Sequence, residues 1–398
     1  MFTTEQWQAG KKIIETLIQH GFEAVFVGGA VRDFVLNKVA NDIDIATSAL
    51  PSEVKSIFTR TVDLGLAHGT VLVIENHVPI EVTTFRTEGE YTDHRRPSDV
   101  KFVKSLEEDL KRRDFTMNAL AMTSEFNLVD LFDGQQDLHK GIIRTVGEPT
   151  DRFKEDALRM LRAVRFSAQL GFSIETATLD AIKLRANDLA YVSVERLATE
   201  LEKMWLSTHL GQGMTYLAQS NLSKHLPGDF PFENARWNEL GNPQNVLVCW
   251  AFLCLLQDKP TGSELATVFK LSNDLKQQIN YLVTATQIRC ERLFTIADFY
   301  QFEENILVQA ELLSRVLCSG IQQMPTELII QSKQALPIQS IRDLVISGQD
   351  IMEWLNKPGG PWLKVMLSQI EHAVLHQKVA NNATKLKEWI LNESNSEI

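Results

Sequence analysis

The most constraining feature of the sequence lies between residues 24 and 47. The apolar run at residues 24–27 predicts a buried strand, the Gly28 and Gly29 pair a tight turn, and residues 30–36 a short helix. Asp42-Ile43-Asp44-Ile45 then alternates polar and apolar residues, so a strand here would place both carboxylates on one face and both isoleucines in the core. The chain must therefore fold locally as strand, turn, helix and strand.

Both parts of this stretch suit a charged ligand. A glycine turn that opens a helix leaves backbone N–H groups facing outward with no Cβ in the way, so phosphate can bind there. Asp42 and Asp44 repel each other unless a cation lies between them, and carboxylate oxygens favour Mg²⁺. Taken alone, each feature also fits an ordinary turn or an acidic strand end.

Together, Gly28-Gly29-Ala30-Val31-Arg32-Asp33 and Asp42-x-Asp44 resemble the signature of polymerase-β-like nucleotidyltransferases. More narrowly, they are similar to class II tRNA nucleotidyltransferases and bacterial poly(A) polymerases. The resemblance implies an α+β fold, in which a nucleotidyltransferase head is followed by an all-α neck, body and tail. One departure is Asn37, where the family usually has Gly; Asn tolerates the left-handed conformation better than most residues.

The hydrophobic pattern along the chain agrees with this division. Up to about residue 146 it predicts helices at 5–20 and 52–59 and strands at 70–75 and 78–85; beyond that, helical periodicity dominates. With this pattern, the resemblance implies a catalytic head at 1–146, a base-recognising neck at 147–210, a body at 211–325 and a tRNA-binding tail at 326–398. The longest apolar run, 246–256, is too short for a membrane span and predicts a buried helix. Without a signal-peptide pattern at the start, we expect a cytoplasmic protein with no membrane partner.

Composition adds two expectations. The net charge is −11 and no long stretch is basic overall, so any RNA contact must come from local basic stripes. Cys249, Cys254, Cys290 and Cys318 show no Cys-x-x-Cys spacing, which predicts reduced buried thiols rather than a zinc ribbon or a redox pair.

The strand predicted at 78–85 and the segment after it add to the head. Glu81 either supports the Asp42 and Asp44 pair as a third carboxylate or faces outward as an ordinary strand residue. Residues 86–99 are polar and contain Gly89 and Pro97, which predicts a mobile loop. In the family this position resembles the flexible loop that helps to switch from C to A addition, which disfavours an enzyme restricted to adding C.

Residues 112–119, Arg-Arg-Asp-Phe-Thr-Met-Asn-Ala, form a second dense motif. Arg112 and Arg113 supply donors for phosphate or ribose oxygens, and Asn118 can bond a 2′-hydroxyl. A solvated basic turn that enters a helix has the same pattern. The block closely resembles the ribose-recognition motif of the family.

A helix predicted at 151–168 carries the most informative pattern. Its apolar residues share one side, while Asp156, Arg159, Arg162 and Arg165 form a stripe around the other. Asp156 and Arg159 could form an intrahelical salt bridge on a solvated face. No nearby acid matches the three arginines, however, which favours a face turned toward an anion.

The pair of Asp156 and Arg159 has a specific chemical use. A carboxylate only accepts hydrogen bonds and a guanidinium only donates them. Cytosine and adenine both offer an amine donor beside a ring-nitrogen acceptor, whereas uracil and guanine present a carbonyl and an N–H. Such mismatches can give strong rejection, so side chains could select C and A without a nucleic-acid template. The Glu155-Asp156-x-x-Arg159 motif of the family is understood to work in this way.

Two further blocks resemble family motifs. Residues 130–144 match a springlike element that joins the catalytic and helical parts, and Glu195-Arg196-Leu197, with Glu200, matches a motif that braces the nucleotide-binding helix. Taken alone, each fits a structural turn or an amphipathic helix.

The resemblance implies an enzyme that adds C, C and A to the 3′ end of tRNA from CTP and ATP, often as a homodimer. The implied roles are Mg²⁺ binding by Asp42 and Asp44, triphosphate binding by Gly28, Gly29 and Arg32, sugar binding by Arg113 and Asn118, and base binding by Asp156 and Arg159, assisted by Arg162 and Arg165. The alternatives are a relative that adds only the final A, a poly(A) polymerase and, less favoured, a non-catalytic tRNA-binding protein.

Overall fold

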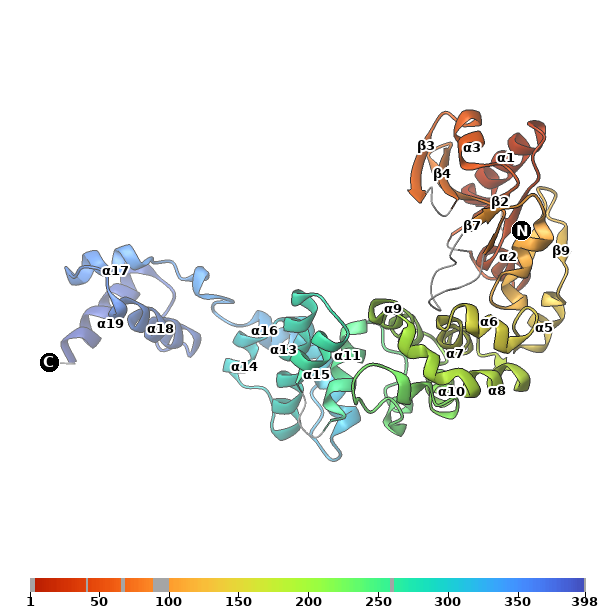
Figure 1. Ribbon diagram of the computed structural model, residues 1–398. Coiled ribbons are helices and arrows are strands. Elements are labelled where there is room, and N and C mark those ends of the chain that lie inside the picture. Colours follow the sequence, from red (N-terminus) through yellow and green to blue (C-terminus); the bar gives the residue numbers. More distant parts are fainter. Residues whose placement is uncertain (1–3, 41, 66–68, 89–99, 258–260, 397–398) are drawn as a thin grey trace. The chain divides into compact units, whose positions relative to one another are not determined.

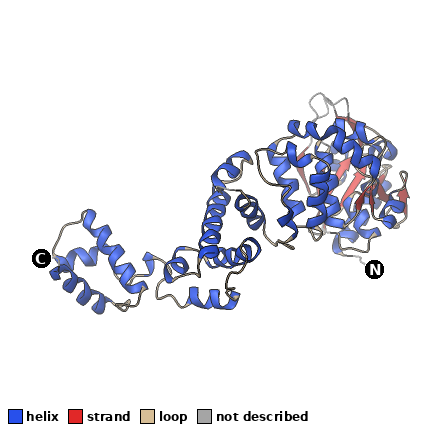
Figure 2. Ribbon diagram, turned by 90° about the horizontal axis from the view of Figure 1, so that it is seen from below, coloured by secondary structure: helices blue, strands red, loops and turns tan. Residues whose placement is uncertain are grey.

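The computed structural model describes residues 4–40, 42–65, 69–88, 100–257 and 261–396, and these divide into two compact units. The first unit comprises residues 1–246 and 268–270, and the second comprises 247–267 and 271–398. Within the described residues, every strand belongs to the first unit (Figures 1 and 2). A mixed head followed by helices confirms the predicted α+β class.

A seven-stranded sheet forms the head, in the order β3-β4-β5-β2-β1-β8-β9. Only β2 and β5 pair in parallel; the other neighbours are antiparallel. The strands of this sheet are β1 Ala24–Val27, β2 Asp44–Thr47, β3 Thr61–Gly65, β4 Thr70–Glu75, β5 Val78–Thr84, β8 Leu120–Met122 and β9 Leu128–Asp130. The short strands outside it are β6 Arg86–Glu88 with β7 Val100–Phe102, and β10 Ile142–Ile143 with β11 Ser173–Ile174.

Ten α-helices and a short 3₁₀ helix that matters for the site are described in the first unit. They are α1 Glu5–Gln19, α2 Gly29–Val35, α3 Pro51–Ile57, α4 Leu106–Lys111, η2 Thr116–Asn118, α5 Gly134–Lys140, α6 Pro149–Glu155, α7 Leu158–Leu170, α8 Thr176–Arg185, α9 Val194–Trp205 and α10 Leu210–Gln219.

The second unit is helical wherever its secondary structure is regular and described. Its α-helices are α11 Val246–Leu255, α12 Gly262–Val268, α13 Asn273–Glu291, α14 Ile296–Gln301, α15 Glu304–Leu317, α16 Thr326–Gln334, α17 Gly348–Leu355, α18 Pro361–Leu375 and α19 Ala383–Ser396. The first residue of α11 and the last residue of α12 belong to the first unit. Helix α11 is buried, as the apolar run predicts. None of the described helices combines the length and the apolar character that a membrane crossing requires.

The core of the head is built on β1, whose four residues are all buried between β2 and β8. Helix α1 packs on this sheet, with the Trp7 ring edge-on to Phe26 at 4.8 Å between ring centroids. Ile43 and Ile45 are buried, as the alternating pattern predicts. Asn37 has a φ of 54°, so the residue that replaces the usual glycine does adopt the left-handed conformation.

Strand β2 begins at Asp44, two residues later than predicted. Its pairing with β1 ends where Val27 faces Asp44, because Gly28 turns the chain away with a φ of 72°. Asp42 therefore lies in an exposed bend just before the strand rather than inside it. Of the predicted loop at 86–99, residues 86–88 form β6, and 89–99 lie outside the described residues.

The single helix predicted at 151–168 is wrong. Helix α6 ends at Glu155 and α7 begins at Leu158, and between them Asp156 has an extended conformation with φ −138° and ψ 104°. The Asp156 carboxylate accepts the backbone N–H of Leu158 at 3.1 Å, which satisfies a donor at the start of α7. A break here turns Asp156 away from the helical stripe on which it was expected.

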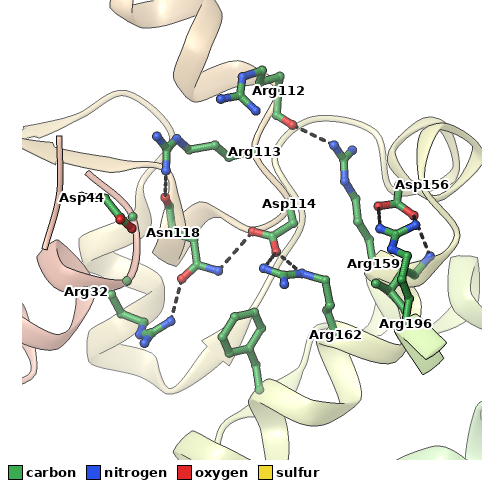
Figure 3. A pocket seen from close by; sticks show the side chains of 14 residues that line it. Arg32, Asp44, Arg112, Arg113, Asp114, Asn118, Asp156, Arg159, Arg162 and Arg196 are labelled. Carbon is green, nitrogen blue, oxygen red and sulfur yellow. Dashed lines mark hydrogen bonds and ion pairs between the residues drawn. The ribbon is translucent and has the colours of Figure 1, made fainter. Parts of the chain in front are cut away.

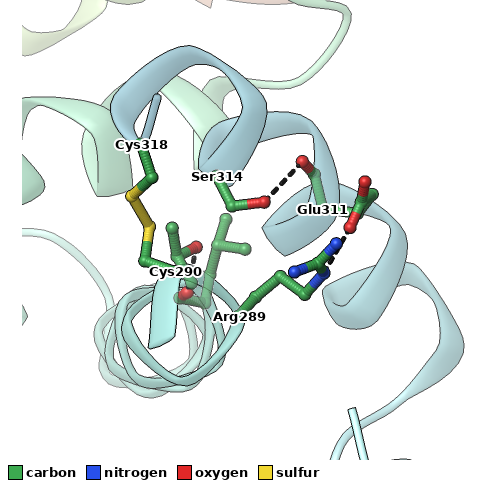
Figure 4. Close-up of a disulfide and its surroundings, with 7 residues drawn as sticks. Arg289, Cys290, Glu311, Ser314 and Cys318 are labelled. Carbon is green, nitrogen blue, oxygen red and sulfur yellow. Dashed lines mark hydrogen bonds and ion pairs between the residues drawn. A yellow bond between two sulfur atoms is a disulfide. The ribbon is translucent and has the colours of Figure 1, made fainter. Parts of the chain in front are cut away.

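The expectation of four reduced thiols is also wrong. Cys290, near the end of α13, is disulfide-bonded to Cys318, which follows α15, with a Cα–Cα distance of 5.8 Å (Figure 4). Only close packing of α13 against α15 brings together two residues that are 28 apart in sequence. Cys249 and Cys254 are buried outside any disulfide, as expected, and burial raises the pKa of the Cys254 thiol to about 12.

A buried ionic network lies next to the disulfide (Figure 4). Arg289 donates to Glu311 at 2.5 Å, and each side chain is only 2% exposed. The other carboxylate oxygen of Glu311 accepts from Arg315 at 2.8 Å and from the backbone N–H of Met324 at 2.9 Å. Both the network and the disulfide thus hold the segment that leaves α15.

Candidate active site

A cavity of about 410 Å³ opens in the first unit where the head meets the neck helices (Figure 3). The β1–α2 turn, β2, the segment around η2, α7 and α9 all contribute to it. Its lining residues are Gly28, Gly29, Arg32, Asp44, Arg112, Arg113, Asp114, Asn118, Asp156, Leu158, Arg159, Arg162, Phe166 and Arg196.

The glycine turn places the backbone against charged side chains. A Cβ on Gly28 would lie 3.1 Å from Arg113 Nη1 and 3.8 Å from Asp44 Oδ2, and its φ of 72° also disfavours any other residue. Arg32, one turn into α2, is held by Asp33 at 2.8 Å and donates to Asn118 Oδ1 at 2.9 Å. Its guanidinium is therefore fixed at the edge of the cavity.

Acidic side chains lie close together at the start of β2. Asp44 is half-buried and lies in register with Glu81 on the parallel neighbour β5, which places both side chains on the same face of the sheet. Burial raises the pKa of the Asp44 carboxyl, Glu81 and Asp42 raise it further, and Arg113 lowers it only in part. Burial is the largest of these effects, and the contributions of Glu81 and Asp42 are those of carboxylates that repel one another.

Such a donor set fits a hard divalent cation, which would relieve that repulsion. Glu81 lies beside Asp44, but it is exposed and does not line the cavity, so its position agrees with both interpretations. Within the described ranges, no group of three His, Cys, Asp or Glu residues is already arranged to hold a metal ion.

The arginine pair that opens the second motif is anchored by one acid. Asp109 is 1% exposed and accepts from Arg112 at 2.8 Å and from Arg113 at 3.1 Å. Burial raises the pKa of Asp109, but the two guanidiniums outweigh this effect and leave it below its usual value. Asp109 thus fixes both arginines at the cavity wall.

A polar relay crosses from the head to α7. The Asn118 amide accepts from Arg32 and donates to Asp114 Oδ1 at 3.1 Å, and Asp114 Oδ2 accepts from Arg162 at 2.9 and 2.7 Å (Figure 3). Burial raises the pKa of Asp114, yet Arg162 and Asn118 more than compensate and lower it to about 2. Four side chains from three segments thus form one continuous chain of hydrogen bonds.

Asp156 and Arg159, the residues expected to recognise the base, each have partners of their own. Arg196 on α9 donates to Asp156 Oδ2 at 2.7 Å, while Arg159 donates to Glu155 at 2.5 Å and to the backbone carbonyl of Arg112 at 2.9 Å. The structure therefore gives Asp156 and Arg159 separate partners, and the alternative of a salt bridge between them within one helix is wrong. Both side chains still line the same cavity.

The remaining arginines of α7 are matched by acids, although none of these acids stands near them in the sequence. Arg162 pairs with Asp114 and lies 3.7 Å from Glu200, and Arg165 pairs with Glu200 inside the protein. These acids are far away in sequence, so the local pattern could not show them. Arg165 is only 6% exposed and does not line the cavity.

Of the expected site residues, most converge on the cavity, whereas Asp42, Glu81, Glu155, Arg165 and Glu195 do not line it. Exposed Glu195 pairs instead with Lys270 at 2.9 Å. The cavity also contains three residues that sequence reasoning did not select: Asp114, Leu158 and Phe166. Each stands inside a motif already singled out, but nothing in a local pattern indicated where its side chain would point.

Comparisons with known proteins agree with this site. Residues 24–144 match the poly A polymerase head domain, 171–229 the probable RNA- and SrmB-binding site of polymerase A, and 242–390 the putative domain 2 of tRNA nucleotidyltransferase. The CCA-adding enzyme of Geobacillus sp. (strain WCH70) is 43% identical over 397 residues, which cover 98% of each chain. The chain belongs to the family of CCA-adding enzymes. The CCA-adding enzyme of Bacillus cereus (strain G9842) is 42% identical over 97% of this chain and 98% of its own.

Solved structures lead to the same family. The Bacillus stearothermophilus CCA-adding enzyme in complex with CTP has a TM-score of 0.88 and 36% identity, and the match covers 99% of both chains. The Thermotoga maritima CCA-adding enzyme complexed with tRNA has a TM-score of 0.63 at 20% identity, with 97% of this chain and 95% of that chain covered, and shares the fold. The resemblance inferred from the motifs is confirmed, and the alternatives within the superfamily are not favoured.

Proposed function

We propose that the cavity between head and neck is where this nucleotidyltransferase of the CCA-adding family binds CTP or ATP and joins it to the 3′ end of tRNA. The observation that carries the proposal is convergence: Asp44, Arg32, Asp156 and Arg159, from motifs separated by more than a hundred residues, line a single cavity. A volume of about 410 Å³ lies within the range of small-molecule sites.

Base selection is assigned to Asp156 and Arg159. The carboxylate would accept the exocyclic amine of cytosine or adenine, and the guanidinium would donate to the adjacent ring nitrogen. Arg196 and Glu155 hold the two groups in place, so little conformational freedom is lost when a base binds. Uracil and guanine would place a carbonyl opposite the carboxylate and an N–H opposite the guanidinium. Neither hydrogen bond could then form, so the site would reject these two bases.

The triphosphate and the sugar are assigned to the head. Arg32 and Arg113 supply fixed cationic donors, and Gly28 and Gly29 let phosphate approach the backbone without a side chain in the way. Asn118 is 7% exposed and already engaged by Arg32 and Asp114. A ribose hydroxyl would therefore bind to its remaining N–H or lone pair.

The metal is assigned to Asp42 and Asp44, with Glu81 supporting Asp44 from the next strand. When bound there, Mg²⁺ would supply charge neutralisation for the α-phosphate and the departing pyrophosphate and favour the ionised 3′-hydroxyl. Arg162, tied to Asp114, would orient α7 toward the nucleotide, and Arg165 would keep that helix in place through Glu200.

Incubation of purified protein and Mg²⁺ with a tRNA that ends at the discriminator base tests this assignment. CTP alone should add two residues and CTP with ATP three, whereas UTP and GTP should add none. Asp44→Ala should abolish extension, while Asp63→Ala, an exposed aspartate on β3, should leave it unchanged. Extension only of a tRNA that already ends in CC, or an open-ended ladder with ATP, would contradict full CCA addition.

Oligomeric state belongs to the same proposal, since the resemblance implies a homodimer. Light scattering should then give about twice the chain mass of 45.1 kDa.

A further inference from the structure

One aromatic ring lies where the nucleotide-binding arginines of the head and neck meet. Phe166, on α7, is 5% exposed and lines the cavity. The guanidinium carbon of Arg32 lies 5.3 Å from its ring centroid, that of Arg162 5.4 Å, and that of Arg165 3.8 Å. Arg32 comes from the head, whereas the ring and the other two arginines belong to the neck.

Together with the polar relay, these contacts connect Arg32 to Arg162 by two routes. Arg32 and Arg162 are joined on one side through Asn118 and Asp114, and on the other side through the face of Phe166. Three like charges around one ring repel one another. The negative face of the ring, together with the acids already paired with these arginines, offsets that repulsion.

We propose that Phe166 is a positioning residue for nucleotide binding. Its ring holds the Arg32 guanidinium against α7, which keeps a fixed distance between the guanidinium assigned to the triphosphate and the helix assigned to the base. The inference rests on the proposed role of Arg32 in triphosphate binding. Phe166 itself acts through Arg32 and makes no contact with the base.

The aromatic ring is what matters in this proposal, so the substitution must remove the ring while retaining apolar volume. Phe166→Leu does so, with Phe166→Met as a second variant should the first fail to fold, and Phe166→Tyr retains the ring. Phe153→Leu, at a fully buried position on the adjacent α6, controls for a general loss of packing. Thermal unfolding establishes which variants are folded.

Dissociation constants for CTP, ATP and inorganic pyrophosphate provide the readout, because pyrophosphate has no base. Loss of the cation–π contact should raise the dissociation constants of all three ligands by the same factor, about 2- to 30-fold. Phe166→Tyr should bind as the unmodified protein does, and Phe153→Leu should lower only thermal stability. Weakening of CTP and ATP without pyrophosphate would place the ring against the base and overturn the proposal, as would equal losses in the Leu and Tyr variants.

The same measurements in an Arg32→Gln variant test the positioning role of Phe166 separately from the assignment of Arg32 to the triphosphate. If the ring acts through Arg32, Phe166→Leu should have no further effect on pyrophosphate binding there. A persisting effect would refute the positioning role. If Arg32→Gln alone leaves the binding of CTP and pyrophosphate unchanged, the assignment of Arg32 to the triphosphate fails instead.

Discussion

Replacement of Asp114 by asparagine should destabilise the first unit measurably. Asp114 is 9% exposed, and its Oδ2 accepts two N–H groups of Arg162 at 2.9 and 2.7 Å. Asparagine keeps the size but removes the charge, which leaves Arg162 with Glu200 at 3.7 Å as its remaining carboxylate. Loss of one partner of a buried pair costs about 3–5 kcal/mol. We expect the lower end, about 3 kcal/mol, because the Arg162 side chain is 32% exposed and water screens it in part.

The same pair predicts a pH dependence with a definite sign. The pKa of Asp114 falls from 3.8 to about 2 on folding, so its ionised form stabilises the native state above pH 4. The full contribution is about 2 kcal/mol, of which roughly half is lost by pH 3 and the rest as the pH falls through 2. Asp114→Asn cannot titrate, so the difference in stability between the two proteins should shrink in acid.

Urea unfolding of the unmodified protein, Asp114→Asn, Arg162→Met and the double variant at pH 7 and at pH 3 measures both effects. The double variant should be less destabilised than the two single changes added together, because it leaves neither charge without its partner. A cost below about 1 kcal/mol at pH 7, or a difference unchanged at pH 3, would refute the reasoning.

Three further substitutions follow from the structure. Cys318→Ser should lower the stability of the second unit under oxidising conditions by about 3.5 kcal/mol, the value for a closed loop of this length, and dithiothreitol should then have no added effect in denaturant titrations. Arg196→Met should free Asp156 and lower the preference for CTP over UTP by about tenfold or more in single-nucleotide extension, with little change in unfolding temperature. Gly28→Ala should cost about 1–2 kcal/mol in urea unfolding and displace Arg113, which raises the KM for CTP; an unchanged KM would show that the close approach is unimportant.

Much of the head could be predicted from the sequence because its signals are local. Strand β4 has the predicted bounds, α1 ends one residue before the predicted end, and Asn37 adopts the conformation that its chemistry allows. In the site, Gly28 and Arg32 follow a turn whose geometry is set within a few residues. Periodicity and turn chemistry are sufficient wherever the deciding contacts lie close in sequence.

The break at Asp156 could not be predicted in this way. Residues 151–168 contain neither Gly nor Pro, and the apolar pattern runs through the break without interruption. The break is accompanied by contacts to Leu158 and to Arg196, the latter 40 residues further along the chain. The disulfide has the same kind of origin, because only the packing of α13 against α15 brings Cys290 to Cys318.

The net charge of the whole chain does not describe the charge at the site, for a related reason. The whole chain carries −11, yet six arginines and only three aspartates line the cavity. Electrostatic binding is decided within about a Debye length, roughly 8–10 Å, so a phosphate group at the site responds to this local excess of positive charge.

Four arginines of the site are also paired with acids: Arg113 with Asp109, Arg159 with Glu155, Arg162 with Asp114 and Arg196 with Asp156. These pairs fix the direction of each guanidinium, and a guanidinium has five N–H groups, more than one carboxylate can accept. A cavity arranged in this way needs little reorganisation to hold a charged nucleotide, which is the condition under which fixed donors stabilise developing charge most effectively. Acids from outside α7 therefore hold its arginines in the orientation in which they would bind a nucleotide.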